Sequence, residues 1–175
     1  NLLRGICTGI ITQMVVIGTH IGTLNTNLSV AITAITCLST IIGSFVYIYL
    51  EKKFNLSIAL TISAGLLIVT MPLSILFGVI PLYVLYFLSY IIVHIVANIM
   101  PMIIYKYVPY NVMAKYTAWR MFLFIFGSAL PGFFLAPLLN SAGAVVVMLI
   151  GGVAMFISSL SYLLVFRKGT PVDNK

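Results

Sequence analysis

Six long apolar stretches follow one another along the chain, with only short polar segments between them. Each is close to the roughly 20 residues that a helix needs to cross the hydrocarbon core of a bilayer. The pattern predicts an all-α polytopic membrane protein with six transmembrane helices in one bundle over residues 1–168, followed by a tail at 169–175. The predicted spans cover residues 5–24, 28–50, 56–78, 80–105, 116–139 and 144–166.

Composition excludes most other classes of protein. Of the 175 residues, 62% are hydrophobic and 6% are charged, and the mean hydropathy is +1.22. A soluble domain of this size needs a more polar surface. The net charge of +7 is divided among separate short segments, which argues against a nucleic-acid partner. Cys7 and Cys37 lie inside apolar stretches without the spacing of metal ligands, so we expect no metal and no cofactor.

The basic residues all lie on one side of the predicted crossings. The links at 25–27, near 79 and at 140–143 contain none. Positively charged segments are retained in the cytoplasm during insertion. We therefore expect both termini and the loops at 51–55 and 106–115 on the cytoplasmic side of the cell (inner) membrane. The basic residues are Arg4, Lys52, Lys53, Lys106, Lys115, Arg120, Arg167, Lys168 and Lys175.

Polar side chains recur at helical spacing on two of the stretches. Such stripes either line a path for a solute or pack against a neighbouring helix through hydrogen bonds. The third and sixth stretches are mostly Leu, Ile and Val, so we expect them to be outer supports. The second stretch carries Thr33, Thr36, Thr40, Gly43 and Tyr47, and the fourth carries Tyr86, Tyr90, His94 and Asn98.

Glycine and proline mark places where helices approach each other or bend. Gly5 and Gly9 form a small-xxx-small pair, which lets two helix backbones come close. The run from Gly127 to Gly132 includes Pro131 and predicts a bend in the fifth helix. Arg120, one turn into that helix, is expected to reach the cytoplasmic surface or to donate to loop carbonyls.

The apolar stretches lack the chemistry of an enzyme. The two acids, Glu51 and Asp173, lie outside them, and acid–base catalysis, many zinc sites and acidic proton relays need a buried carboxylate. His94 and Ser128 lie at a similar depth, but any serine-rich six-helix protein offers such a pair. We therefore expect no enzyme and no catalytic residues. His94 is expected to be neutral, either coupling a proton or making a structural hydrogen bond.

Three segments resemble the C-terminal six-helix half of a major facilitator superfamily transporter. Asn1-Leu2-Leu3-Arg4-Gly5 leads into the first span, and Tyr116-Thr117-Ala118-Trp119-Arg120-Met121 opens the fifth. After the second span, Gly43 and the basic pair Lys52-Lys53 match a cytoplasmic loop signature of the family, with Tyr47 in place of its usual Asp.

The resemblance implies two three-helix inverted repeats and transport of a small solute by alternating access. It also implies that spans one, two, four and five face a central cavity near mid-membrane. A second bundle is then needed, either a missing N-terminal half or a second copy of this chain, with the lipid bilayer and a small-molecule substrate as further partners. The expected substrate pathway contains Thr12, Gln13, Thr36, Thr40, Tyr86, Tyr90, His94, Asn98 and Ser128. The expected gating residues are Gly43, Lys52, Lys53 and Arg120.

Two other functions fit the same pattern of spans. One is a six-helix substrate-binding membrane subunit of an ATP-driven vitamin uptake complex. The other is a membrane scaffold without transport activity, for which the stripe from Tyr86 to Asn98 should be dry and packed.

Overall fold

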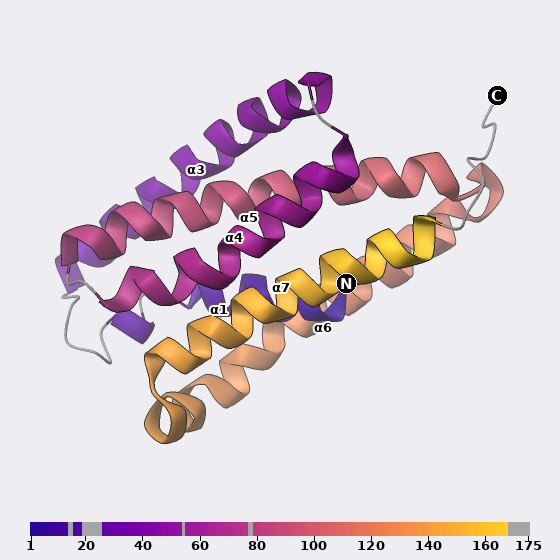
Figure 1. Ribbon diagram of the computed structural model, residues 1–175. Coiled ribbons are helices and arrows are strands. Elements are labelled where there is room, and N and C mark those ends of the chain that lie inside the picture. The colour runs from indigo at the N-terminus through magenta and orange to yellow at the C-terminus, as the bar shows by residue number, and fades with distance from the viewer. Residues whose placement is uncertain (14–15, 19–25, 54, 77–78, 168–175) are drawn as a thin grey trace.

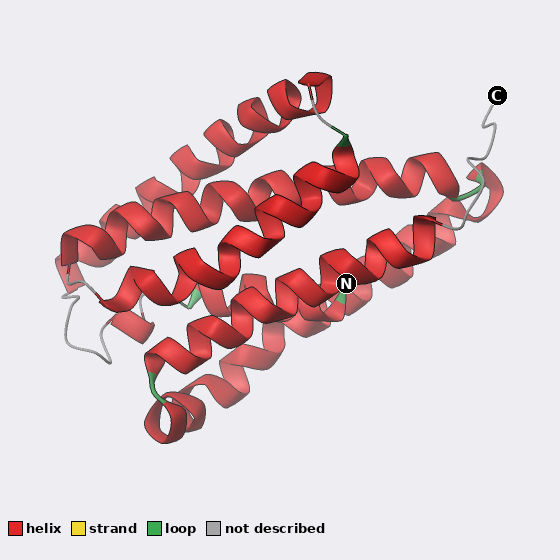
Figure 2. Cartoon of the chain, viewed as in Figure 1, coloured by secondary structure: helices red, strands yellow, loops and turns green. Residues whose placement is uncertain are grey.

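The computed structural model describes residues 1–13, 16–18, 26–53, 55–76 and 79–167, and within this part the chain is helical with short links and no strand (Figure 2). The predicted tail at 169–175 lies outside the described residues. The long helices are α1 (Leu2–Thr12), α3 (Thr26–Lys53), α4 (Leu56–Leu76), α5 (Val79–Tyr107), α6 (Tyr110–Ala142) and α7 (Ala144–Arg167). The all-α prediction is confirmed.

Three of the described helices are long and apolar enough to cross a membrane. They run over Tyr83–Tyr107, Tyr110–Ala142 and Ala144–Val165, which lie in α5, α6 and α7. The apolar described parts of α1, α3 and α4 are shorter, at Leu2–Thr12, Ala34–Leu50 and Ile58–Ser74. A membrane protein is therefore supported, while the count of six crossings stays a prediction.

The first helix ends earlier than the apolar pattern predicts. The predicted span runs from 5 to 24, but α1 ends at Thr12, and Gln13 caps it. The Gln13 amide is shared between the carbonyls of Gly9 and Ile10, both at 3.2 Å, which tightens the last turn. Residues 16–18 are helical again, with the Ile17 amide donating to the Gln13 carbonyl at 3.0 Å.

The predicted loop at 106–115 is almost absent. The helix α5 continues through Lys106 to Tyr107, and α6 begins at Tyr110, so that only Val108 and Pro109 connect them. Pro109 disfavours a helical conformation of the residue before it and serves as the N-cap of α6. The chain therefore turns at the proline, and the basic residues of this segment sit on helix ends.

Except for α4 and α5, the closest helix pairs are not neighbours in sequence (Figure 1). The closest pairs are α1 with α6, α4 with α5, α4 with α7, α3 with α5, and α1 with α7. Consequently α4 and α7 have helices on two sides, while α3 and α6 stand at opposite edges. We expected α4 and α7 to be outer supports, away from a central cavity. The other wall of that cavity would come from a second bundle, so this expectation remains a prediction. Each keeps an exposed apolar face, such as Ile58, Ile62, Leu66 and Val69 on α4.

Glycines allow the closest helix crossings. A Cβ added at Gly5 would lie 2.9 Å from the Gly127 Cα, so α1 and α6 touch backbone to backbone. A Cβ at Gly152 of α7 would lie 2.8 Å from the Ile68 Cα of α4. The bend predicted at 127–132 does not interrupt α6, which continues through Pro131. In this run, Gly127 serves helix packing.

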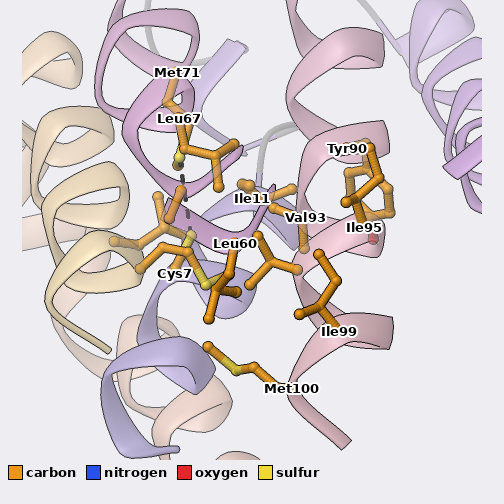
Figure 3. Packing of buried hydrophobic residues seen from close by; sticks show 14 of the residues in the cluster. Cys7, Ile11, Leu60, Leu67, Met71, Tyr90, Val93, Ile95, Ile99 and Met100 are labelled. Carbon is orange, nitrogen blue, oxygen red and sulfur yellow. Dashed lines mark hydrogen bonds between the residues drawn. The ribbon is translucent and has the colours of Figure 1, made fainter. Parts of the chain in front are cut away.

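The core lies where α1, α4, α5 and α7 meet. In Figure 3, Leu67 and Met71 of α4 lie close to Cys7 and Ile11 of α1, and all four side chains are fully buried. The Cys7 Sγ lies 3.9 Å from the Met71 Sδ, as the dashed line marks. The core is thus an apolar seam that includes α5, one of the two helices that carry a polar stripe.

Candidate functional site

The polar stripes of α3 and α5 face each other, a pairing that neither stripe reveals on its own. The Thr36 Oγ1 lies 3.3 Å from the Tyr86 hydroxyl, and the Thr40 Oγ1 lies 2.9 Å from the His94 Nε2. His94 lies near the middle of α5. Residues one turn apart on α3 thus contact polar groups two turns apart on α5. The candidate site consists of these four residues: Thr36, Thr40, Tyr86 and His94.

The hydrogen bonds around Thr40 assign the tautomer of His94. The Thr40 hydroxyl lies 2.9 Å from the Thr36 carbonyl, to which it donates its single proton. With that proton on the carbonyl, Oγ1 is the acceptor toward His94, which favours the tautomer whose Nε2 carries a proton and donates it. The other ring nitrogen, Nδ1, is left as a hydrogen-bond acceptor.

Gly43 makes this contact possible. A Cβ at this position would lie 2.8 Å from the His94 Cβ and 3.0 Å from the Ile91 carbonyl oxygen. The sequence resemblance treats Gly43 as part of a gating loop, but it lies inside α3 at the contact with α5. In the structure, Gly43 allows α3 and α5 to approach each other closely.

Sequence reasoning missed Ser39, which belongs to the same contact. Ser39 is fully buried, and its hydroxyl lies 2.6 Å from the Ile35 carbonyl and 3.4 Å from the Phe87 carbonyl of α5. The signal was present, because Ser39 and Gly43 form a small-xxx-small pair on α3. Like Gly43, Ser39 lets α5 come close.

The aromatic members of the stripe lie in contact along α5, with their rings tilted relative to one another. Ring centroids are 5.5 Å apart for Tyr86 and Tyr90, and 5.3 Å apart for Tyr90 and His94. The tyrosines are 2% and 8% exposed, whereas His94 and Asn98 are half-buried. The His94 end of the stripe is therefore partly exposed at the surface of the bundle, while the Tyr86 end is packed.

The remaining pathway residues lie elsewhere in the bundle. Thr12 bonds back to the Gly9 carbonyl at 2.9 Å, and Ser128 bonds back to the Ile125 carbonyl at 2.8 Å. These two residues and Gln13 lie on the α1–α6 side, and no described hydrogen bond connects them with the stripes of α3 and α5. The nine predicted residues are therefore divided between two helix pairs.

The predicted gating residues also lie apart from the stripes. Lys52 and Lys53 are exposed in the last turn of α3, and the Lys53 Nζ lies 4.8 Å from the centre of the Tyr49 ring. Arg120 lies on α6. Tyr47, which stands in place of the family's Asp, is buried.

The contact between Thr40 and His94 can be tested by removing one hydroxyl. Thr40→Val should cost about 0.6–1.7 kcal/mol, the range found for side-chain hydrogen bonds between membrane helices. Thr40→Ser keeps the hydroxyl and should retain most of the stability. The free energy of unfolding in mixed detergent micelles measures both effects. Equal losses in the two variants would mean that the methyl group matters and the hydrogen bond does not.

A shallow hollow on α6 is a poorer candidate. Its volume is about 260 Å³, and it is lined by Ala118, Trp119 and Phe122. These side chains come from a single helix and are almost entirely apolar, with the indole N–H of Trp119 as their one polar group, whereas a ligand site usually has several converging polar groups. The hollow contains none of the predicted site residues.

Comparison with known proteins adds no assignment, because no family model, curated protein or solved structure matches this chain.

Proposed function

We propose that this chain is a membrane-embedded bundle that transports a small polar solute by alternating access, in the manner of a major facilitator superfamily half. The observation that carries the proposal is the meeting of Thr40 and His94 near the middle of α5, at a place that is only half-buried. Ionisable groups at mid-helix in a membrane bundle face its interior or a water-filled cavity, and they often mark a substrate path.

The pattern of helix pairs supports the proposed repeats. In the proposed repeats, α1 corresponds to α5, α3 to α6 and α4 to α7. Exchanging each helix for its counterpart turns the α1–α6 pair into the α5–α3 pair. It turns the α4–α5 pair into the α7–α1 pair. It turns the α4–α7 pair into itself, and all of these pairs are observed. Two three-helix inverted repeats related by a two-fold axis would pack in this way.

The chemistry of the site favours a neutral solute with hydroxyl or amide groups. The site consists of hydroxyls and a His94 ring whose Nδ1 is an acceptor, and it contains no charged side chain. A solute N–H or O–H can donate to Nδ1, and the rings of Tyr90 and His94 offer flat apolar surface beside it. Such neutral sites suit sugars and other polar uncharged molecules.

The edges of the bundle support a second bundle as partner. About 22% of the apolar window of α6 is buried, against 50% for those of α5 and α7. The helix α3 likewise exposes Phe45, which is 70% accessible. We propose that a second six-helix bundle covers these edges and closes the solute path, and that the basic helix ends face the cytoplasm.

Cysteine labelling tests the path directly. In a protein lacking Cys7 and Cys37, His94→Cys should react with a charged, membrane-impermeant thiol reagent because the proposed path is wet. Met155→Cys, at a fully buried core position, should remain unlabelled. Failure of the cysteine at 94 to react from either side of the membrane would refute the path and favour the scaffold.

Two reference positions give the sidedness. Asn111 and Asn140 are both exposed and lie near opposite ends of α6. A cysteine at 111 should react only from the cytoplasmic side and a cysteine at 140 only from the outer side. Reversed labelling would contradict the proposed topology, but it would not contradict the proposed solute path.

A further inference from the structure

Arg4 and Arg120 bring two positive charges together on the α1–α6 side of the bundle. Arg4 lies on α1, and its guanidinium carbon is 4.7 Å from the centre of the Phe124 ring. Phe124 lies one turn beyond Arg120 on α6. The two arginines are close enough for their charges to repel each other. Different helices thus supply two like charges to one place.

Among the residues that the structure describes, neither arginine has an acceptor that neutralises its charge. The Arg4 Nη1 lies 3.8 Å from the Met100 Sδ, and a thioether is only a weak acceptor. The Arg120 Nε and Nη1 are shielded from solvent and donate to no acceptor in the described part of the chain. The expectation that Arg120 donates to loop carbonyls is therefore wrong for these two nitrogens. None of the described side chains around the two arginines carries a carboxylate.

Hydroxyl and amide groups surround the pair. The Tyr162 hydroxyl of α7 donates to the Asn1 Oδ1 at 2.7 Å. Tyr162 is also close enough to both arginines to interact with them electrostatically, and Tyr116 is close enough to Tyr162 to do the same. Tyr116 lies one turn before Arg120 on α6. These neutral groups cannot cancel the two positive charges, and a buried charge without a counter-charge costs several kcal/mol.

The depth of Arg120 matches the edge of the hydrocarbon. It lies ten residues beyond the start of α6 at Tyr110, or about 15 Å along the helix. The 33 residues of α6 extend about 50 Å, which exceeds the roughly 30 Å of hydrocarbon by about 10 Å at each end. The guanidinium is therefore within reach of lipid phosphates and of dissolved anions.

We infer that Arg4 and Arg120 form a binding site for a phosphate-type oxyanion, carried either by a lipid headgroup or by a free anion. Guanidinium groups bind such oxyanions through charge-assisted hydrogen bonds. Arg4 and Arg120 lie on α1 and α6, whereas Thr40 and His94 lie on α3 and α5, and the proposed site does not depend on the proposed transport function.

The experiment measures thermal unfolding of the full-length protein with two probes. One arm compares potassium phosphate with potassium chloride at equal ionic strength in a neutral detergent. The other compares phosphatidylcholine nanodiscs with and without phosphatidylglycerol. At a ligand concentration ten times the dissociation constant, the midpoint should rise by about 3–6 °C. A rise with inorganic phosphate identifies a free anion, and a rise confined to phosphatidylglycerol identifies a lipid.

Substitutions separate the site from general charge effects. Arg4→Gln and Arg120→Gln should each abolish the rise, while Lys115→Gln, an exposed position on the same helix, should keep it. Without ligand, Arg120→Gln should melt at the same temperature as the unmodified protein or higher, because one repulsion is removed. A rise that persists in both arginine variants, or no rise with either probe, would overturn the proposal.

An internal carboxylate is tested by neutralising both acids of the chain. A Glu51→Gln/Asp173→Asn double variant should respond to the probe as strongly as the unmodified protein. A clearly larger response would show that an acid of the chain already occupies the arginine pair and would reject an external anion.

Discussion

Replacing Gly127 by alanine is expected to destabilise the bundle by about 1–3 kcal/mol, the usual cost of overpacking. The added Cβ would lie 3.1 Å from the Leu2 carbonyl carbon and 3.2 Å from the Gly5 Cα. Backbone atoms cannot rotate away as a side chain can, so α1 must move off α6. The free energy of unfolding in mixed micelles, or the thermal midpoint in one detergent, measures this effect.

Gly132 provides the matched control on the same helix. A Cβ there meets nothing within 4 Å, and the position is exposed. Gly132→Ala should therefore stabilise α6 by up to about 1 kcal/mol, because alanine is the better helix former. Destabilisation by both substitutions to the same degree would mean that the backbone contact between α1 and α6 is absent in the membrane.

Truncating Leu67 should have the second large effect. Leu67 is fully buried on α4 against α1, and Leu→Ala at such positions costs about 2–5 kcal/mol through lost contacts and the remaining cavity (Figure 3). Its neighbour Leu66, about 100° around the helix, is 49% exposed. Leu66→Ala should cost less than about 1 kcal/mol, since lipid fills the space that the side chain leaves.

The two leucines together test the rotation of α4 about its axis. They are adjacent in sequence, chemically identical and equally apolar, so that only their direction distinguishes them. A larger loss from Leu66→Ala than from Leu67→Ala would show that α4 presents the opposite face to the core.

The apolar pattern predicts most helix bounds within a few residues. The spans predicted at 28–50, 56–78, 80–105 and 144–166 correspond to α3, α4, α5 and α7. Hydrophobicity does not report local hydrogen bonding, so the pattern missed the end of α1 at Thr12. It also placed a loop at 106–115, because Lys106 and Lys115 are polar even though they continue helices.

The candidate site was predicted only in its parts. Helical spacing identifies the Thr36–Thr40 stripe and the Tyr86–His94 stripe, but spacing along one helix contains no information about its partner. The pairing depends on Gly43 and Ser39, whose small size becomes informative only once α5 lies beside them. The two buried nitrogens of Arg120 that donate to no described acceptor could not be predicted either, because burial by other helices depends on the tertiary structure.

The crossing of α1 and α6 also sets an order of assembly during synthesis. Gly5 and Gly127 are more than a hundred residues apart in the sequence. The surface of α6 that contacts α1 has therefore not been synthesised when α1 enters the membrane. At about 5–20 residues per second, α6 follows on the order of ten seconds later. Throughout this interval the glycine face of α1 is open to lipid, to other nascent helices or to an insertion chaperone, and its final contact forms among the last in the bundle.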